Sequence, residues 1–249
     1  MSKSLATIFA LFTFALVNGQ TDSVSIDCEA LSLKWTAEVK AKPADTELMK
    51  LALREVLSAK CNDGKYIFDI ALSLYSLEKS SGLATLIASE YLKRDDTVSA
   101  TKYLNDCISL ASDSETLKYA HLQLVGLLVH AKKYDEARTT YLALASKGII
   151  DYPTAYTKIG DLYMKTAKEY LPPPEVRDPI TNQGAYFAAY DMYEKAENEK
   201  KMNAAKQALP SKHDIFICPS LGNESYKEGS QTEVYGWIGG TATIRYRDQ

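Results

Sequence analysis

Residues 156–163 read Tyr-Thr-Lys-Ile-Gly-Asp-Leu-Tyr, and the spacing of their bulky and small side chains decides the fold. Tyr156, Ile159 and Tyr163 are three or four positions apart, so they share one helix face, with Gly160 beside them. The small residues allow two helix backbones to approach closely. The stretch therefore predicts an antiparallel helical hairpin. The second helix supplies Ala189, Tyr193 and Ala196.

The same pattern occurs twice earlier in the chain. From Ala84 to His121 is 37 residues and from His121 to Tyr156 is 35, so the period is about three dozen positions. One copy consists of Ala84, Ile87, Ala88 and Tyr91, then Ala100, Leu104 and Cys107. The other consists of His121, Leu124, Val125 and Leu128, then Ala137, Tyr141 and Leu144.

Short turns rich in Gly, Asn, Asp, Ser and Lys separate nine predicted helices and favour antiparallel neighbours. A weaker copy of the pattern has Ala52, Val56 and Ala59, with Trp35 one position ahead of the expected place. The pairing of helices between residues 45 and 79 stays open. The predicted helices are 27–41, 45–60, 64–79, 82–94, 97–112, 115–131, 134–147, 153–169 and 184–198.

At these residues the chain resembles the tetratricopeptide repeat (TPR) family, and Lys133-Tyr134-Asp135-Glu136-Ala137 is similar to its helix-turn-helix junction. The resemblance covers residues 27–198. It implies a mainly α fold, a right-handed solenoid of antiparallel helix hairpins. It also implies that the first helix of each repeat lines a concave face that binds a protein or peptide. The register places Tyr119, Gln123, His130, Thr157, Asp161 and Lys165 in that face.

An insertion at residues 165–188 interrupts the last repeat and contains Leu171-Pro172-Pro173-Pro174, which is typical of polyproline II. We expect it to project from one face, either as a recognition element or as a tolerated surface loop. Tyr186 and Tyr190 lie beside it and are predicted partner contacts, since Tyr is favoured at interfaces.

The period changes from helical to alternating in the C-terminal residues 211–249. Residues 232–238 and 241–246 flank Gly239-Gly240, which predicts a β-hairpin with a two-residue turn. A lone hairpin is marginal in water, so we expect Trp237, Ile238 and Ile244 to dock on the last helices. Residues 214–218 form a further strand candidate.

The N-terminus has the pattern of a secretory signal peptide over residues 1–20, with Lys3 before an apolar run at residues 5–17. That run is shorter than the ~20 residues that span a bilayer, although a retained anchor helix is the alternative. With the repeats and the tail, the chain resembles exported TPR proteins of Gram-negative bacteria. The resemblance implies a periplasmic, outer-membrane-associated or extracellular protein without an integral membrane segment in its mature form.

Export would place four cysteines in an oxidising compartment. Cys28 opens the first predicted helix and Cys61 closes the second, so a hairpin would bring them together as a disulfide. Cys107 and Cys218 could form a second pair, but Cys107 occupies a core position where a buried thiol is the common explanation.

Composition excludes several classes of protein. An apolar content of 46% excludes disorder as the main state, and a net charge of −3 with interspersed signs argues against nucleic-acid binding. The three histidines are not clustered for zinc, and no Gly-x-Ser-x-Gly or glycine-rich phosphate loop occurs. We therefore expect a protein-binding adaptor without catalytic, metal or cofactor sites. A structural subunit of an outer-membrane or secretion assembly and a hydrolase with a cryptic site are the alternatives.

Overall fold

The computed structural model describes residues 27–61, 65–212 and 227–247. The chain divides into two compact units, residues 1–67 and 68–249, and helix α3 (Lys65–Leu77) lies across the division. None of the described helices is long and apolar enough to cross a bilayer. The predicted signal peptide at residues 1–20 and the strand candidate at residues 214–218 lie outside the described residues.

The first unit contains a hairpin of helices α1 (Cys28–Ala41) and α2 (Thr46–Ser58). Asp27 and Asp45 cap the two helices by accepting hydrogen bonds from backbone N–H groups of the first turn. Trp35 is buried and its Nε1 donates to Glu55 Oε2 at 3.2 Å. Trp35 therefore joins the two helices although it stands one position ahead of the repeat pattern.

A disulfide closes this hairpin. The predicted bond between Cys28 and Cys61 is confirmed, with Cα atoms 5.3 Å apart and a sequence separation of 33. Cys107 is a buried free thiol that lies 3.1 Å from Thr85 Oγ1. Cys218, its possible partner, lies outside the described residues.

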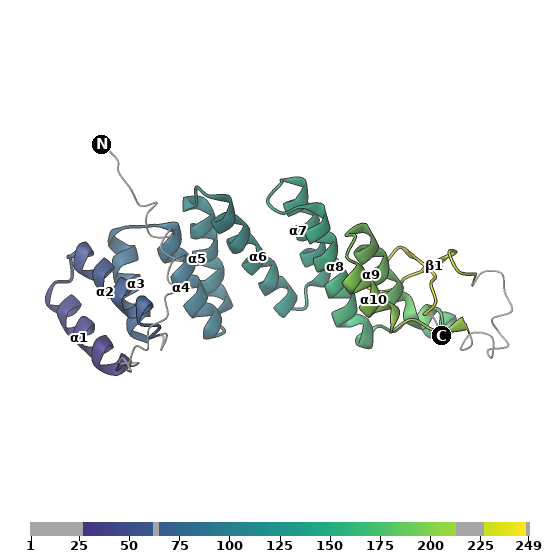
Figure 1. The fold of residues 1–249 in the computed structure, drawn as a ribbon, viewed down its shortest axis with the longest axis horizontal. Helices are drawn as coiled ribbons and strands as arrows, with labels where there is room; N and C mark the ends of the chain where they lie inside the picture. Colours follow the sequence, from purple (N-terminus) through teal and green to yellow (C-terminus); the bar gives the residue numbers. More distant parts are fainter. Residues whose placement is uncertain (1–26, 62–64, 213–226, 248–249) are drawn as a thin grey trace, which may run out of the picture. The chain divides into compact units, whose positions relative to one another are not determined.

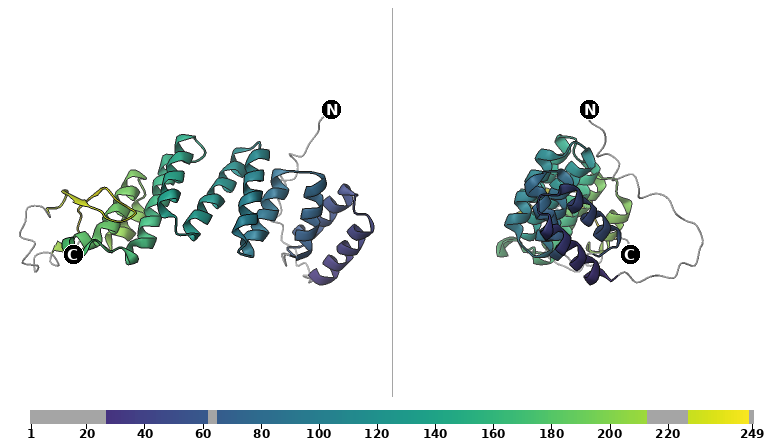
Figure 2. Two further views of the ribbon diagram at one scale, coloured as in Figure 1. Left: turned by 180° about the vertical axis from the view of Figure 1, so that it is seen from behind. Right: turned by 90° about the vertical axis from the view of Figure 1, so that its left-hand side faces the viewer.

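The second unit is a succession of antiparallel helices that follow one another in chain order (Figure 1; seen from behind in Figure 2). Helices α4 and α5 pack extensively, as do α8 and α9, while α6 and α7 pack less extensively. These helix pairs are the predicted repeats, so the mainly helical repeat fold is confirmed. The helices are α4 (Ser81–Lys93), α5 (Thr97–Leu110), α6 (Ser114–His130), α7 (Tyr134–Ser146), α8 (Tyr152–Thr166), α9 (Gly184–Lys195) and α10 (Glu199–Lys206).

Helix α10 brings the described helices to ten, so the predicted total of nine is wrong. The predicted helix 184–198 instead ends at Lys195, because Glu197 adopts a positive φ of 52°. Asn198 then caps the next helix by accepting from Lys201 N at 3.1 Å. Helix α10 contains few apolar residues, so its sequence carries no apolar period.

The insertion folds back on the helices and contains three short 3-10 turns, η1 (Ala167–Glu169), η2 (Pro174–Val176) and η3 (Thr181–Gln183). Ile180 is fully buried, and Asp178 Oδ1 accepts from the backbone N–H groups of Ile180 and Thr181 at 2.7 Å. The expectation that the whole insertion projects is therefore wrong, because its apolar end joins the core. Leu171 remains 69% exposed.

The C-terminal hairpin consists of β1 (Gln231–Glu233) and β2 (Thr241–Thr243), with Thr232 opposite Ala242. Its loop covers residues 234–240, so the predicted two-residue turn is wrong. Val234 N still donates to Gly240 O at 2.9 Å, and Val234 and Ile238 are both buried in the core. Gly239 and Gly240 adopt positive φ as expected, at 61° and 76°.

The expected docking of the hairpin is confirmed. Ile244 and Ala242 are fully buried against the core of the second unit. The Trp237 ring contacts those of Tyr134 and Tyr163, with its centroid 5.3 Å from each. Arg138 donates to the Ile238 carbonyl oxygen, so the tail contacts both α7 and α8.

Asp191 of α9 holds the tail by two bonds. It accepts from Thr243 N at 2.9 Å and pairs with Arg245, and both charged side chains are less than one-fifth exposed. We expect Asp191→Ala to lower the free energy of unfolding by about 1–2 kcal/mol, because the Thr243 N–H loses its acceptor and Arg245 loses the more buried of its two carboxylate partners. Hydrogen exchange should show faster amide exchange in residues 227–247.

Glu194→Ala is the matched control, because Glu194 also pairs with Arg245 at 2.7 Å but is largely exposed. It should change the exchange rates little. Equal protection of the tail in both variants would contradict the role assigned to Asp191.

Candidate functional site

The contact between Gly160 and Tyr193 joins α8 to α9 and fixes which face of α8 is left for other contacts. A Cβ at position 160 would lie 2.6 Å from Tyr193 Cε1, so only glycine fits there. Tyr193 is 2% exposed, and its hydroxyl donates to Asp161 Oδ1 at 2.8 Å. The predicted packing of a small residue against a bulky one is confirmed at this pair.

Two of the predicted partner contacts on α8 have intramolecular bonds. Asp161 Oδ1 also lies 2.7 Å from Lys201 Nζ of α10, and burial together with the Asp161 hydrogen bond raises the pKa of Tyr193. Thr157 Oγ1 accepts from Asn198 Nδ2 at 3.5 Å. The negative charge of Asp161 is thus balanced by the positive charge of Lys201 in the same chain. Lys165 is exposed.

Three of the predicted partner contacts, Tyr119, Gln123 and His130, share one face of α6. At 100° per residue they fall on the same side of the helix as Gly126. Tyr119 is 39% exposed, and Gly126 and His130 are exposed. The structure therefore brings these residues together on a face that is open to solvent.

Apolar side chains on α6 are buried less completely than those on α8. Ala120 and Val125 are the buried residues of α6, a helix of 17 residues. Val125 occupies the repeat position that Gly160 has in α8. In α8 the glycine leaves room for the Tyr193 ring of α9, whereas α6 has a branched side chain at that position. The half-buried side chains are Leu117, Leu122, Leu124, Leu127, Leu128 and Val129.

The predicted contacts on α9 are already packed within the chain. Tyr186 and Tyr190 are half-buried against the core. The Arg245 guanidinium lies 4.6 Å from the Tyr190 ring centroid, a cation–π contact made by the tail. Tyr186 and Tyr190 lie beside the insertion as predicted, and the tail contacts the Tyr190 ring.

Sequence reasoning missed Gly126, Leu122 and Val129 as members of the α6 face. The repeat register contained the signal, because these positions lie on the same side of the helix as Tyr119 and His130. These residues are small or aliphatic, whereas the predicted contacts are polar or aromatic.

Titratable groups form no metal cluster in the described part of the chain, where no three His, Cys, Asp or Glu side chains are close enough to share an ion. His121 occupies its predicted packing position, and burial followed by the nearby Lys147 lowers its pKa. His130 lies at the end of α6 and is exposed.

No family model matches the chain, and no curated protein matches it. Among solved structures, a crystal structure of MamA is similar at 17% sequence identity with a TM-score of 0.47. The similarity covers 72% of this chain and 91% of that chain. The assignment of helical repeats rests on the packing of α4 to α9 described above.

Proposed function

We propose that the protein is an exported, non-enzymatic scaffold that binds another polypeptide through the α6 face, defined as Tyr119, Leu122, Gln123, Gly126, Val129 and His130. The observation that carries this proposal is the incomplete burial of α6. Leu122 and Val129 on this face are half-buried, and the helix gains stability when another apolar surface covers them.

Export is supported by the disulfide between Cys28 and Cys61, because such bonds persist in oxidising compartments. The apolar pattern of residues 1–20 points to the same route. A structural subunit of a larger assembly is the second hypothesis, in which the exposed residues Gln231 and Glu233 of β1 would contact a neighbour.

Site-specific photo-crosslinking in the native host tests the proposal. A photoreactive amino acid replaces Gln123 or His130 in separate full-length variants. Val98 is the control position, since it lies on α5 and is 81% exposed. We expect discrete crosslinked products from positions 123 and 130 and none from position 98, because a specific partner covers one face only.

Two outcomes would contradict the proposal. Equal crosslinking at positions 98 and 123 would indicate nonspecific encounters. A fourth variant carries the photoreactive amino acid at Glu233, and crosslinks from it with none from either α6 position would favour the assembly subunit, because the tail would then be the contact surface.

A further inference from the structure

Packing within the chain does not require a glycine at position 126. Gly126 lies in the middle of α6, where glycine weakens a helix relative to most other residues. A Cβ at this position would meet no atom within 4 Å, whereas a Cβ at Gly160 would collide with Tyr193. Packing therefore explains Gly160 and leaves Gly126 without an internal reason.

The neighbours of Gly126 suit contact with a second polypeptide. Leu122 and Val129 lie one turn away on either side and are half-buried against the core. Tyr119 and His130 flank them and are exposed. An absent side chain between two aliphatic ones allows a main chain to approach the helix closely, which is a common use of glycine at binding sites.

On α8, the helix face that corresponds to the α6 face is predominantly basic. Lys158 and Lys165 of α8 are exposed, while Asp161 is neutralised by Lys201. On α4, Lys93 pairs with the buried carboxylate of Glu90, so this pair adds no net charge. The chain as a whole carries −3, so this face departs in sign from the rest of the protein.

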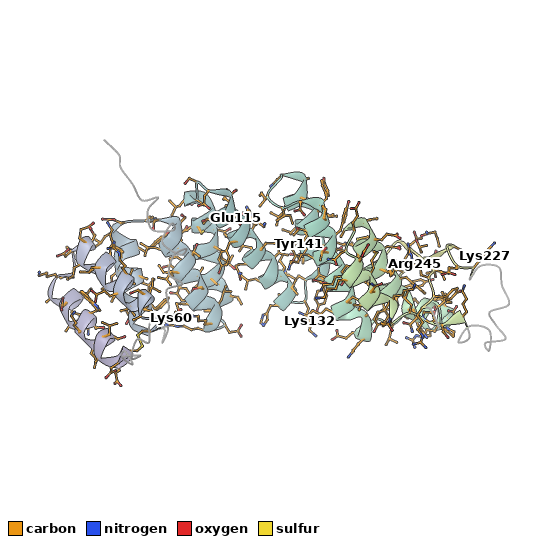
Figure 3. The ribbon with its side chains drawn as sticks, viewed as in Figure 1. Lys60, Glu115, Lys132, Tyr141, Lys227 and Arg245 are labelled. Atoms are coloured by element: carbon orange, nitrogen blue, oxygen red, sulfur yellow. A yellow bond between two sulfur atoms is a disulfide. The ribbon has the colours of Figure 1, made fainter. Side chains whose placement is uncertain are left out.

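The charges at the two ends of α6 differ. Glu115 lies in the first turn, and Lys132 follows the last turn at the opposite end of the helix (Figure 3). His130 lies at the same end as Lys132, and Lys133 there pairs with Glu136 at 3.0 Å. The basic character of the face is thus concentrated toward the C-terminal end of α6, away from Glu115.

We infer that the partner presents an extended acidic segment whose main chain passes over Gly126, with an apolar side chain placed between Leu122 and Val129. This inference rests on the proposed function and specifies the chemistry of the partner. Acidic residues of the segment meet Lys158, Lys165 and the basic end of α6. Complementary charge then sets specificity and the rate of encounter.

Synthetic peptides supply the probe. Three fluorescent peptides have the same number and spacing of leucines, and their remaining positions are glutamate, serine or lysine. Fluorescence anisotropy with the full chain should show the acidic peptide binding at least about tenfold more tightly than the basic one, with an affinity that falls as salt is added.

Gly126→Glu is the test variant, because a carboxylate side chain would block the approach and repel the acidic peptide. It should fold normally, since space is open at this position and glutamate favours a helix more than glycine does. We expect it to weaken binding of the acidic peptide at least about tenfold. Val98→Glu adds the same charge at an exposed site on α5 and should leave binding unchanged.

Equal binding of the acidic and basic peptides would overturn the inference. So would unchanged binding by a Gly126→Glu protein whose thermal midpoint matches the parent. Crosslinks from positions 123 and 130 do not depend on peptide charge, so they would uphold the scaffold proposal even where the acidic preference failed. Loss of those crosslinks would remove both.

Discussion

Replacing Cys28 and Cys61 together by serine should lower the free energy of unfolding of the α1–α2 hairpin by about 3–4 kcal/mol. The bond closes a long loop, with the two cysteines 33 positions apart, and so removes many conformations from the unfolded chain. The hairpin buries few large side chains besides Trp35 and Met49, so this contribution is a large share of its stability.

Hydrogen exchange of the full-length protein measures this effect by segment. Peptides from α1 and α2 should lose protection in the double variant, while peptides from α8 and α9 should not. Reduction of the parent protein by a thiol reagent is the matching control and should reproduce the same pattern. Unchanged protection in α1 and α2 would show that the helices hold together without the bond.

Gly160→Leu should lower the free energy of unfolding by about 2–3 kcal/mol. The new side chain would enter the space of the Tyr193 ring, which is buried and whose hydroxyl is bonded to Asp161, so the ring cannot swing aside cheaply. Chemical denaturation with fluorescence detection gives the loss. Displacement of the ring should also remove the hydrogen bond to Asp161.

Gly126→Leu is the matched control, because Gly126 also lies inside a first helix of a repeat but faces open space. Its stability should be unchanged or higher by about 0.5 kcal/mol, since leucine favours a helix more than glycine does. Opposite signs for the two variants are expected. A similar loss in both would indicate that helix backbone geometry, and not the Tyr193 ring, determines the requirement for glycine at position 160.

The α6 face shows how far sequence reasoning reached toward the candidate site. Tyr119, Gln123 and His130 were grouped from the repeat register alone, and the structure places them on one exposed face. The sequence could not show that Asp161 is neutralised by Lys201, because these residues are 40 positions apart and belong to helices α8 and α10. The repeat register already separates Gly126 from Gly160, because Val125 occupies the repeat position of Gly160, but only the structure shows that a side chain at position 126 would meet open space.

By itself, the sequence determined the helical repeat and the Cys28–Cys61 disulfide, because both follow from local periodicity and from the short connection between antiparallel helices. Tertiary structure alone decided the end of α9 and the start of α10, the burial of Ile180 and the length of the hairpin loop. In each of these, burial of a side chain in a core formed by distant residues, or a turn with positive φ, outweighed local preference. The periodicity of the sequence determines which side chains lie on the same helix face. Only the tertiary packing determines which residues that face contacts.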